Sequence, residues 1–165
     1  MEHLHGYMSC RLLWDPDFDV DGGILEFCRI YYGAAGDELA TYILRMQELD
    51  AYERSVKGVY PSYPGIHMSY HAGPVLKFSV MQDSDACFTR ALETTGKSEP
   101  YRRRIEMARM GNDLSILAYA PKDHPLRGPA HRRFFGLADE IGLEAPIHLR
   151  ETGSQSIEKL RLHFE

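Results

Sequence analysis

The sequence lacks several features that would assign it to a common class of protein. No apolar run approaches the roughly 20 residues needed to span a bilayer, so we expect no membrane partner. The segment from Met1 to Tyr7 mixes polar and apolar side chains, whereas a secretory signal has a basic start followed by an apolar stretch. We therefore expect a cytoplasmic protein, in which amphipathic structure begins almost at the first residue.

Cysteine is scarce, with only 3 residues at wide spacing: Cys10, Cys28 and Cys87. There is no CxxC pair and no zinc-like spacing of cysteine and histidine. Cys10 and Cys28 fall on predicted apolar helix faces. Because a free cysteine behaves as a small hydrophobic residue, we expect both in the core.

Catalytic motifs are also missing. The sequence has no G-x-S-x-G motif and no glycine-rich phosphate loop. Its acidic residues are scattered over predicted helix surfaces and caps, whereas glycoside hydrolysis needs two carboxyl groups facing one cleft. We predict no catalytic residue, no bound metal and no cofactor in this chain.

The bulk composition is that of an ordinary globular protein. The chain has 165 residues, of which 44% are hydrophobic and 26% charged, enough for a single domain over residues 1–165. The net charge of −5 argues against a nucleic-acid partner, because such proteins need a basic face to neutralise phosphates.

Helical spacing of apolar residues dominates the chain and predicts an all-α fold, an irregular bundle of six or seven helices with little or no strand. The helices are expected over residues 4–14, 24–32, 34–55, 84–95, 98–119, 134–141 and 157–164, and a short extended piece over 147–149. Pro16 is expected to end the first helix, Asp19 or Asp21 to cap the second, and Gly33 to end it.

One long loop rich in proline, glycine and tyrosine, residues 58–74, interrupts the helical pattern. Its tyrosines Tyr60, Tyr63 and Tyr70 are candidates, with Trp14, for a ligand site in which aromatic faces stack on a sugar. The same rings are equally suited to cover the apolar core.

Three polar clusters are candidate ligand or metal sites. The alternating aspartates of residues 15–21 lack the glycine that a calcium loop of the EF-hand type requires, so capping is the favoured interpretation. His67 and His71 are four residues apart but lie in the predicted loop instead of on a helix. The run Arg102–Arg104 is expected on a solvated helix face with one member turned inward to an ion pair, with Glu99 and Glu106 as candidate partners.

The front of the chain carries a family resemblance. A helix ending in Leu13-Trp14-Asp15-Pro16 is followed by an acidic linker, then Glu26-Phe27 and Tyr31-Tyr32-Gly33. This pattern resembles the C-terminal portion of large bacterial proteins that carry the domain DUF4838 and are similar to family 20 glycoside hydrolases and α-glucuronidases. The segments 101–105, 134–141 and 147–151 resemble the same family more loosely.

The resemblance implies that the catalytic groups lie on a (β/α)8 barrel upstream, so that this chain is fragment-like and supports a carbohydrate-active barrel it does not contain. It then predicts an exposed apolar face on the first one or two helices, where the barrel would sit. Two alternatives stay open: a stand-alone carbohydrate-binding module, and a helical interaction module that forms a homo-oligomer through the same face.

Overall fold

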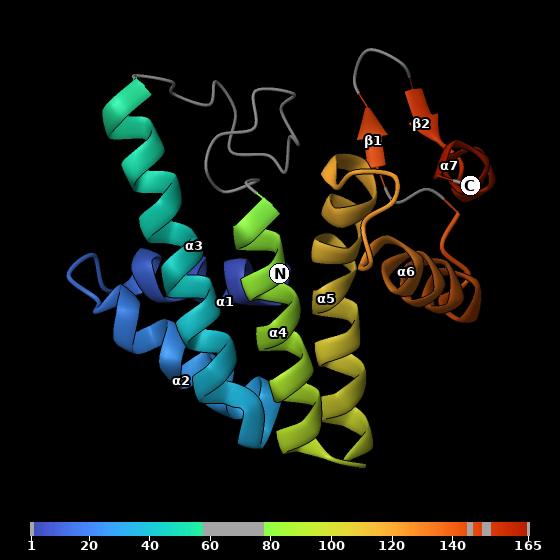
Figure 1. Ribbon diagram of the computed structural model, residues 1–165. Coiled ribbons are helices and arrows are strands. Elements are labelled where there is room, and N and C mark those ends of the chain that lie inside the picture. Colours follow the sequence, from blue (N-terminus) through green and yellow to red (C-terminus); the bar gives the residue numbers. More distant parts are fainter. Residues whose placement is uncertain (1, 58–77, 145–146, 150–152, 165) are drawn as a thin grey trace. The chain divides into compact units, whose positions relative to one another are not determined.

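The computed structural model describes residues 2–57, 78–144, 147–149 and 153–164 (Figure 1). These residues form α-helices, one short 3-10 helix and a small hairpin: α1 (Glu2–Trp14), α2 (Val20–Tyr32), η1 (Gly33–Ala35), α3 (Gly36–Lys57), α4 (Phe78–Thr95), α5 (Glu99–Tyr119), α6 (Arg127–Ile141), β1 (Ile147–Leu149), β2 (Gly153–Gln155) and α7 (Ile157–Phe164). The all-α prediction is confirmed. The predicted loop of residues 58–74 lies outside the described residues.

The chain divides into two compact units, Met1–Ala108 and Arg109–Glu165, with the boundary inside α5. The expectation of a single domain over residues 1–165 stays a prediction. Among the described helices, none combines the length and the apolar character that a membrane crossing demands.

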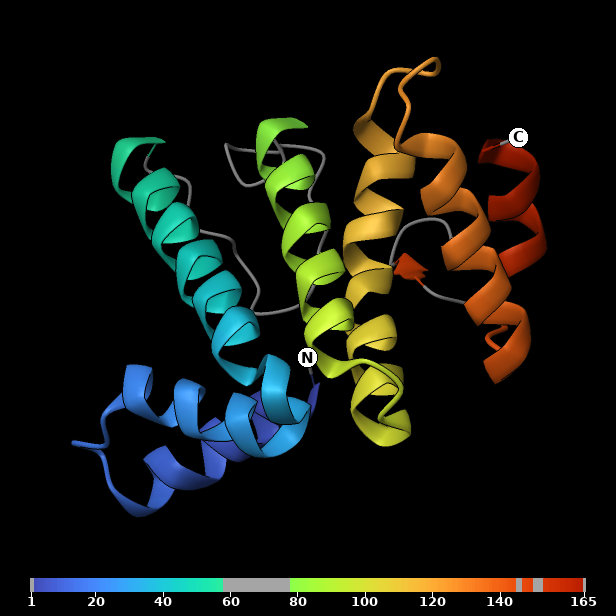
Figure 2. The same ribbon diagram turned by 60° about the horizontal axis from the view of Figure 1, so that its bottom comes forward.

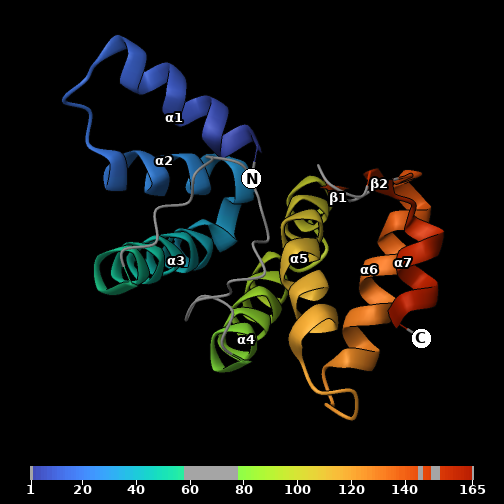
Figure 3. The same ribbon diagram turned by 90° about the horizontal axis from the view of Figure 1, so that it is seen from above.

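In the first unit, α1 and α2 form a hairpin (Figure 3). Pro16 lies two residues beyond the end of α1, as predicted, because the residue before a proline avoids the α conformation. Asp19 caps α2 by accepting a hydrogen bond from the Gly22 amide at 3.1 Å, and Gly33 ends α2 with a φ of 60°. Both predicted signals are confirmed.

The inner face of α2 consists of four buried side chains at helical spacing: Ile24, Phe27, Cys28 and Tyr32. The sequence pattern predicted this face correctly. The expectation for Cys10 is wrong, because its side chain is exposed. Leu4, Tyr7 and Met8 lie on the inner face of α1 at i, i+3 and i+4, and Cys10 does not continue this spacing.

Helices α3 and α4 pack side by side over the core of this unit (Figure 2). Leu39 and Ile43 of α3, and Phe88 and Ala91 of α4, are buried in one cluster. Helix α4 begins at Phe78, earlier than predicted, because buried Ser84 does not interrupt it. The Ser84 hydroxyl donates to the Val80 carbonyl oxygen at 2.7 Å, so the polar side chain is satisfied within the helix.

The second unit contains the last turns of α5, the helices α6 and α7, and the β1–β2 hairpin. Phe134 and Phe135 of α6 are buried, with their rings edge to face and centroids 5.0 Å apart. Gly142 ends α6 in the left-handed conformation, with a φ of 65°. β1 pairs antiparallel with β2, so the extended piece predicted at residues 147–149 is confirmed.

Candidate functional site

Of the residues predicted to bind a ligand, the structure places one. Trp14 is the last residue of α1, and its side chain is 92% exposed. Tyr60, Tyr63 and Tyr70 lie outside the described residues, so whether they approach Trp14 is not tested. The four-residue sugar site stays a prediction.

Trp14 belongs to a group of exposed apolar side chains, which we call the hairpin tip and which consists of Leu12, Leu13, Trp14 and Val20. They flank the connection between α1 and α2. Leu13 is 87% exposed, whereas Leu12 and Val20 are each 38% exposed. Ile30, also exposed, lies near the other end of α2. An exposed apolar surface on the first two helices is what the resemblance predicts.

The acidic connection between α1 and α2 performs turn and cap chemistry. Asp15 Oδ1 accepts a hydrogen bond from the Asp17 amide at 3.1 Å, in addition to the Asp19 cap of α2. Within the ranges that the structure describes, no group of three histidine, cysteine, aspartate or glutamate side chains is arranged to hold a metal ion. His67 and His71 fall outside those ranges.

The arginines of residues 102–104 make different kinds of contact. Arg102 forms the expected ion pair with Glu106, with Nε and Oε1 3.1 Å apart. Arg104 turns inward, but to backbone and ring instead of a carboxylate. It donates to the Tyr31 carbonyl oxygen at 2.8 Å, and its guanidinium lies 4.4 Å from the Tyr31 ring centroid. These contacts tie the first turns of α5 to the end of α2.

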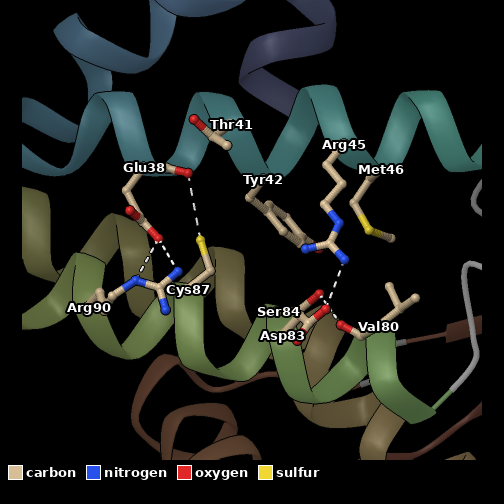
Figure 4. Close-up of a pocket in the computed structure, with 10 residues that line it drawn as sticks. All are labelled: Glu38, Thr41, Tyr42, Arg45, Met46, Val80, Asp83, Ser84, Cys87 and Arg90. Atoms are coloured by element: carbon tan, nitrogen blue, oxygen red, sulfur yellow. Dashed lines mark hydrogen bonds and ion pairs between the residues drawn. The ribbon is translucent and has the colours of Figure 1, made fainter.

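A small pocket lies between α3 and α4 in the first unit (Figure 4). An ion pair borders each side of it. Arg90 Nε donates to Glu38 Oε1 at 2.9 Å, and Arg45 Nη2 donates to Asp83 Oδ2 at 2.8 Å. Its volume of about 70 Å³ holds a few waters, whereas sites for drug-sized ligands start near 300 Å³.

Tyr42 and Cys87 lie between these two ion pairs (Figure 4). Burial raises the pKa of Tyr42 to about 12. Burial, with the nearby Glu38 side chain, raises the pKa of the Cys87 thiol to about 12 as well, and the thiol donates to the Glu38 carbonyl oxygen at 3.6 Å. A thiol held protonated is a poor nucleophile, and both carboxylates of the pocket are engaged in ion pairs. The arrangement joins two helices and offers no acid and base pair.

Sequence reasoning missed this pocket, since its residues are spread from position 38 to position 90 and only the packing of α3 on α4 brings them together. Within α3 and within α4, these residues fit the ordinary spacing of a helix. No motif in the chain could have identified them as neighbours.

Comparison with known proteins gives one finding. Residues 1–44 match the family model Domain of unknown function (DUF4838). The match covers α1, α2, η1 and the first turns of α3, so the front of the resemblance is confirmed. The looser resemblance over residues 101–151 stays a prediction. Neither a curated protein nor a solved structure matches the chain.

Proposed function

We propose that this chain is a non-catalytic helical part of a glycoside hydrolase-like protein of the DUF4838 type, and that its α1–α2 hairpin packs against a carbohydrate-active barrel. The observation that supports the proposal best is the exposure of Leu13 and Trp14 at consecutive positions, inside the segment that matches the family model. Large apolar side chains so exposed, and grouped together, are typical of an interaction surface.

The energetics of the hairpin tip suit such a contact. Fully burying one large apolar side chain contributes about 1.5–3 kcal/mol, so Leu13 and Trp14 together contribute about 3–6 kcal/mol at an interface. Tryptophan is also enriched among the residues that dominate binding energy. Leu12 and Val20, each partly exposed, extend the surface beside them.

Four acidic residues of the described ranges have contacts that suit a non-catalytic role. Glu38 and Asp83 form ion pairs with arginines, and Glu26 accepts a hydrogen bond from the Tyr7 hydroxyl at 2.7 Å. Asp19 caps a helix. Each of these carboxylates has a structural role, so the proposal assigns the reacting acid and base to the barrel.

The test is binding in trans. A barrel-containing DUF4838 protein, from which the segment matching residues 1–44 has been deleted, is titrated with this chain and followed by calorimetry. We expect saturable 1:1 binding that the double variant Leu13→Ser, Trp14→Ser weakens at least tenfold, the effect of losing more than about 1.4 kcal/mol.

The matched control is Ile30→Ser, which removes an exposed apolar side chain from the same hairpin but away from its tip. Circular dichroism checks that each variant is folded, as expected for exposed positions. Absence of binding, or equal binding by the tip variant and the control, refutes the proposal.

A second candidate function is carbohydrate recognition by Trp14, favoured by the 92% exposure of its side chain. An exposed indole offers a flat apolar face with a polar N–H at its edge. Because the chain has 1 tryptophan, its fluorescence reports directly on this position in a titration against a panel of glycans. A saturable blue shift with one glycan supports this function if calorimetry detects binding of the same glycan and Trp14→Ala weakens that binding at least tenfold. A flat response to every glycan rejects it.

Self-association through the hairpin tip is the remaining alternative. Light scattering over a range of concentrations detects it. A dimer that dissociates in Leu13→Ser identifies a second copy of the chain as the occupant of the surface, in place of a barrel.

A further inference from the structure

The second unit contains a larger pocket, of about 370 Å³, between the end of α5, the start of α6 and the end of α7. Helices α6 and α7 lie side by side there (Figures 2 and 3). The volume falls within the 300–1,000 Å³ of small-molecule sites. This pocket is distinct from the hairpin tip and from the α3–α4 pocket, because the described residues that line it all belong to the second unit.

The charged side chains that line this pocket are all basic. Lys122, Arg127, His131 and His163 contribute nitrogen atoms, and none of the described residues that line it is an aspartate or a glutamate. The chain as a whole carries a net charge of −5, so a concave surface whose charged lining groups, Lys122 and Arg127, are both basic is a local exception. Such a surface attracts an anion.

Hydrogen bonds to the backbone fix the guanidinium of Arg127. Its Nη1 donates to the carbonyl oxygens of Leu117 and Ala120 at the end of α5, the latter at 3.1 Å. Its Nε and Nη2 have no hydrogen-bond partner in the part of the chain that the structure describes. One edge of a fixed guanidinium therefore remains for a ligand, and this edge is suited to two oxygens of a phosphate or a carboxylate.

His131, which lines the same pocket, carries a buried polar atom. Its Nε2 atom is buried and makes no hydrogen bond with any described residue. A buried polar atom without a partner costs about 1–3 kcal/mol. Because Nε2 is not exposed to the pocket, a ligand oxygen removes this cost only after the imidazole rotates toward the ligand.

The remaining lining residues define the other parts of the ligand. Gly128 belongs to the first turn of α6, the helix end at which the aligned peptide dipoles favour negative charge. The Leu117 side chain and the Phe164 ring supply apolar surface. An anionic group joined to a ring or another apolar body matches this combination.

We infer that this pocket binds a small organic phosphate, with the phosphate held by Lys122, Arg127, His131 and His163 and the organic part against Leu117 and Phe164. A phosphate monoester is preferred to a carboxylate because it offers two negative charges and three oxygens to four basic side chains. The site is independent of the proposed docking of α1 and α2.

The experiment titrates the full chain with phenyl phosphate at constant ionic strength, followed by calorimetry. Inorganic phosphate, benzoate and phenol are the comparison probes. We expect saturable 1:1 binding of phenyl phosphate, weaker binding of inorganic phosphate because it lacks the apolar part, weaker binding of benzoate, and no binding of phenol.

The variants locate the site. We expect Lys122→Gln and His163→Gln each to weaken phenyl phosphate binding about tenfold, since each removes a contact to a charged oxygen. The control Lys159→Gln removes an exposed lysine of α7 outside the pocket and should leave binding unchanged. Arg127 is left intact, because its hydrogen bonds to α5 make its loss a folding defect.

A second readout is the NMR signals of the histidine side chains. Phenyl phosphate is expected to shift the ring resonances of His131 and His163 but not those of His5 on α1. No saturable binding, equal affinity for benzoate, or variants that match the control each overturns the inference.

Discussion

A single methyl group at Gly36 is expected to destabilise the first unit, although Gly36 has an ordinary helical conformation. Its φ and ψ are −58° and −44°, so alanine fits the backbone without strain. The obstacle is the neighbouring helix. A Cβ at this position would lie 2.5 Å from the Cα and 2.7 Å from the amide nitrogen of Arg29, and 2.7 Å from the Cys28 carbonyl oxygen.

The magnitude follows from these distances. Ordinary contact begins at 3.4 Å, so α3 must move away from α2 by about 1 Å to admit the methyl group. All three atoms are backbone, so no side chain can rotate aside. Overpacking of this kind costs about 1–3 kcal/mol, and alanine returns up to about 1 kcal/mol of helix propensity. We expect a net loss of about 1–2 kcal/mol in the free energy of unfolding.

Urea unfolding followed by far-UV circular dichroism measures this loss. Gly6→Ala is the matched control, because Gly6 lies inside α1 and a Cβ there meets no atom within 4 Å. That substitution should stabilise the protein by up to about 1 kcal/mol. If Gly36→Ala stabilises the protein as Gly6→Ala does, the close approach of α3 to the α2 backbone is wrong.

Further predictions concern the core and the thiols. Phe88→Ala should cost about 3–5 kcal/mol in urea unfolding, because Phe88 is completely buried; a loss below 1 kcal/mol would place it outside the core. Asp113→Asn should cost about 1.5–3 kcal/mol, since it removes the charge of a buried carboxylate that accepts a hydrogen bond from the partly exposed Arg133, with Nε and Oδ1 3.1 Å apart; an unchanged urea midpoint contradicts this. Of the three cysteines, Cys10 alone should react rapidly with Ellman's reagent in the folded protein, and fast reaction of a second thiol would disprove the burial of Cys28 and Cys87. Burial raises the pKa of both buried thiols from 9.0 to about 12, so their contribution to stability is complete below pH 9 and is lost as the pH rises toward about 12; an alkaline titration of the unfolding free energy that stays flat across this range refutes it.

Local signals in the sequence were sufficient for most of the helices. The spacing of apolar residues on α2, the proline after α1 and the glycines at positions 33 and 142 each act within a few residues, and each predicted the observed boundary. The start of α4 was misplaced because Ser84 appears polar in the sequence, whereas its hydroxyl bonds to the preceding turn. The prediction that Cys10 lies in the core failed because apolar residues on several sides of α1 do not define which face is buried.

How far each candidate site could be predicted depended on how close its residues lie in the sequence. Trp14 and Leu13 were identifiable from the sequence because their motif is continuous, and the family match falls on the same segment. Their exposure could not be read from the sequence, since the same residues would be buried if another helix covered them. The pocket of the second unit joins Leu117 to Phe164, and no local pattern predicts that these two positions lie together.

The amino-acid sequence by itself determined an all-α chain, the C-terminal ends of its main helices and a front segment similar to DUF4838, because these properties depend on local conformation and on short motifs. The tertiary structure alone decided which apolar residues remain exposed, how closely α3 approaches the backbone of α2, and which basic side chains surround one pocket. These depend on packing between residues far apart in the chain. Solvent exposure and electrostatic environment are properties of that packing, and no short stretch of sequence contains them.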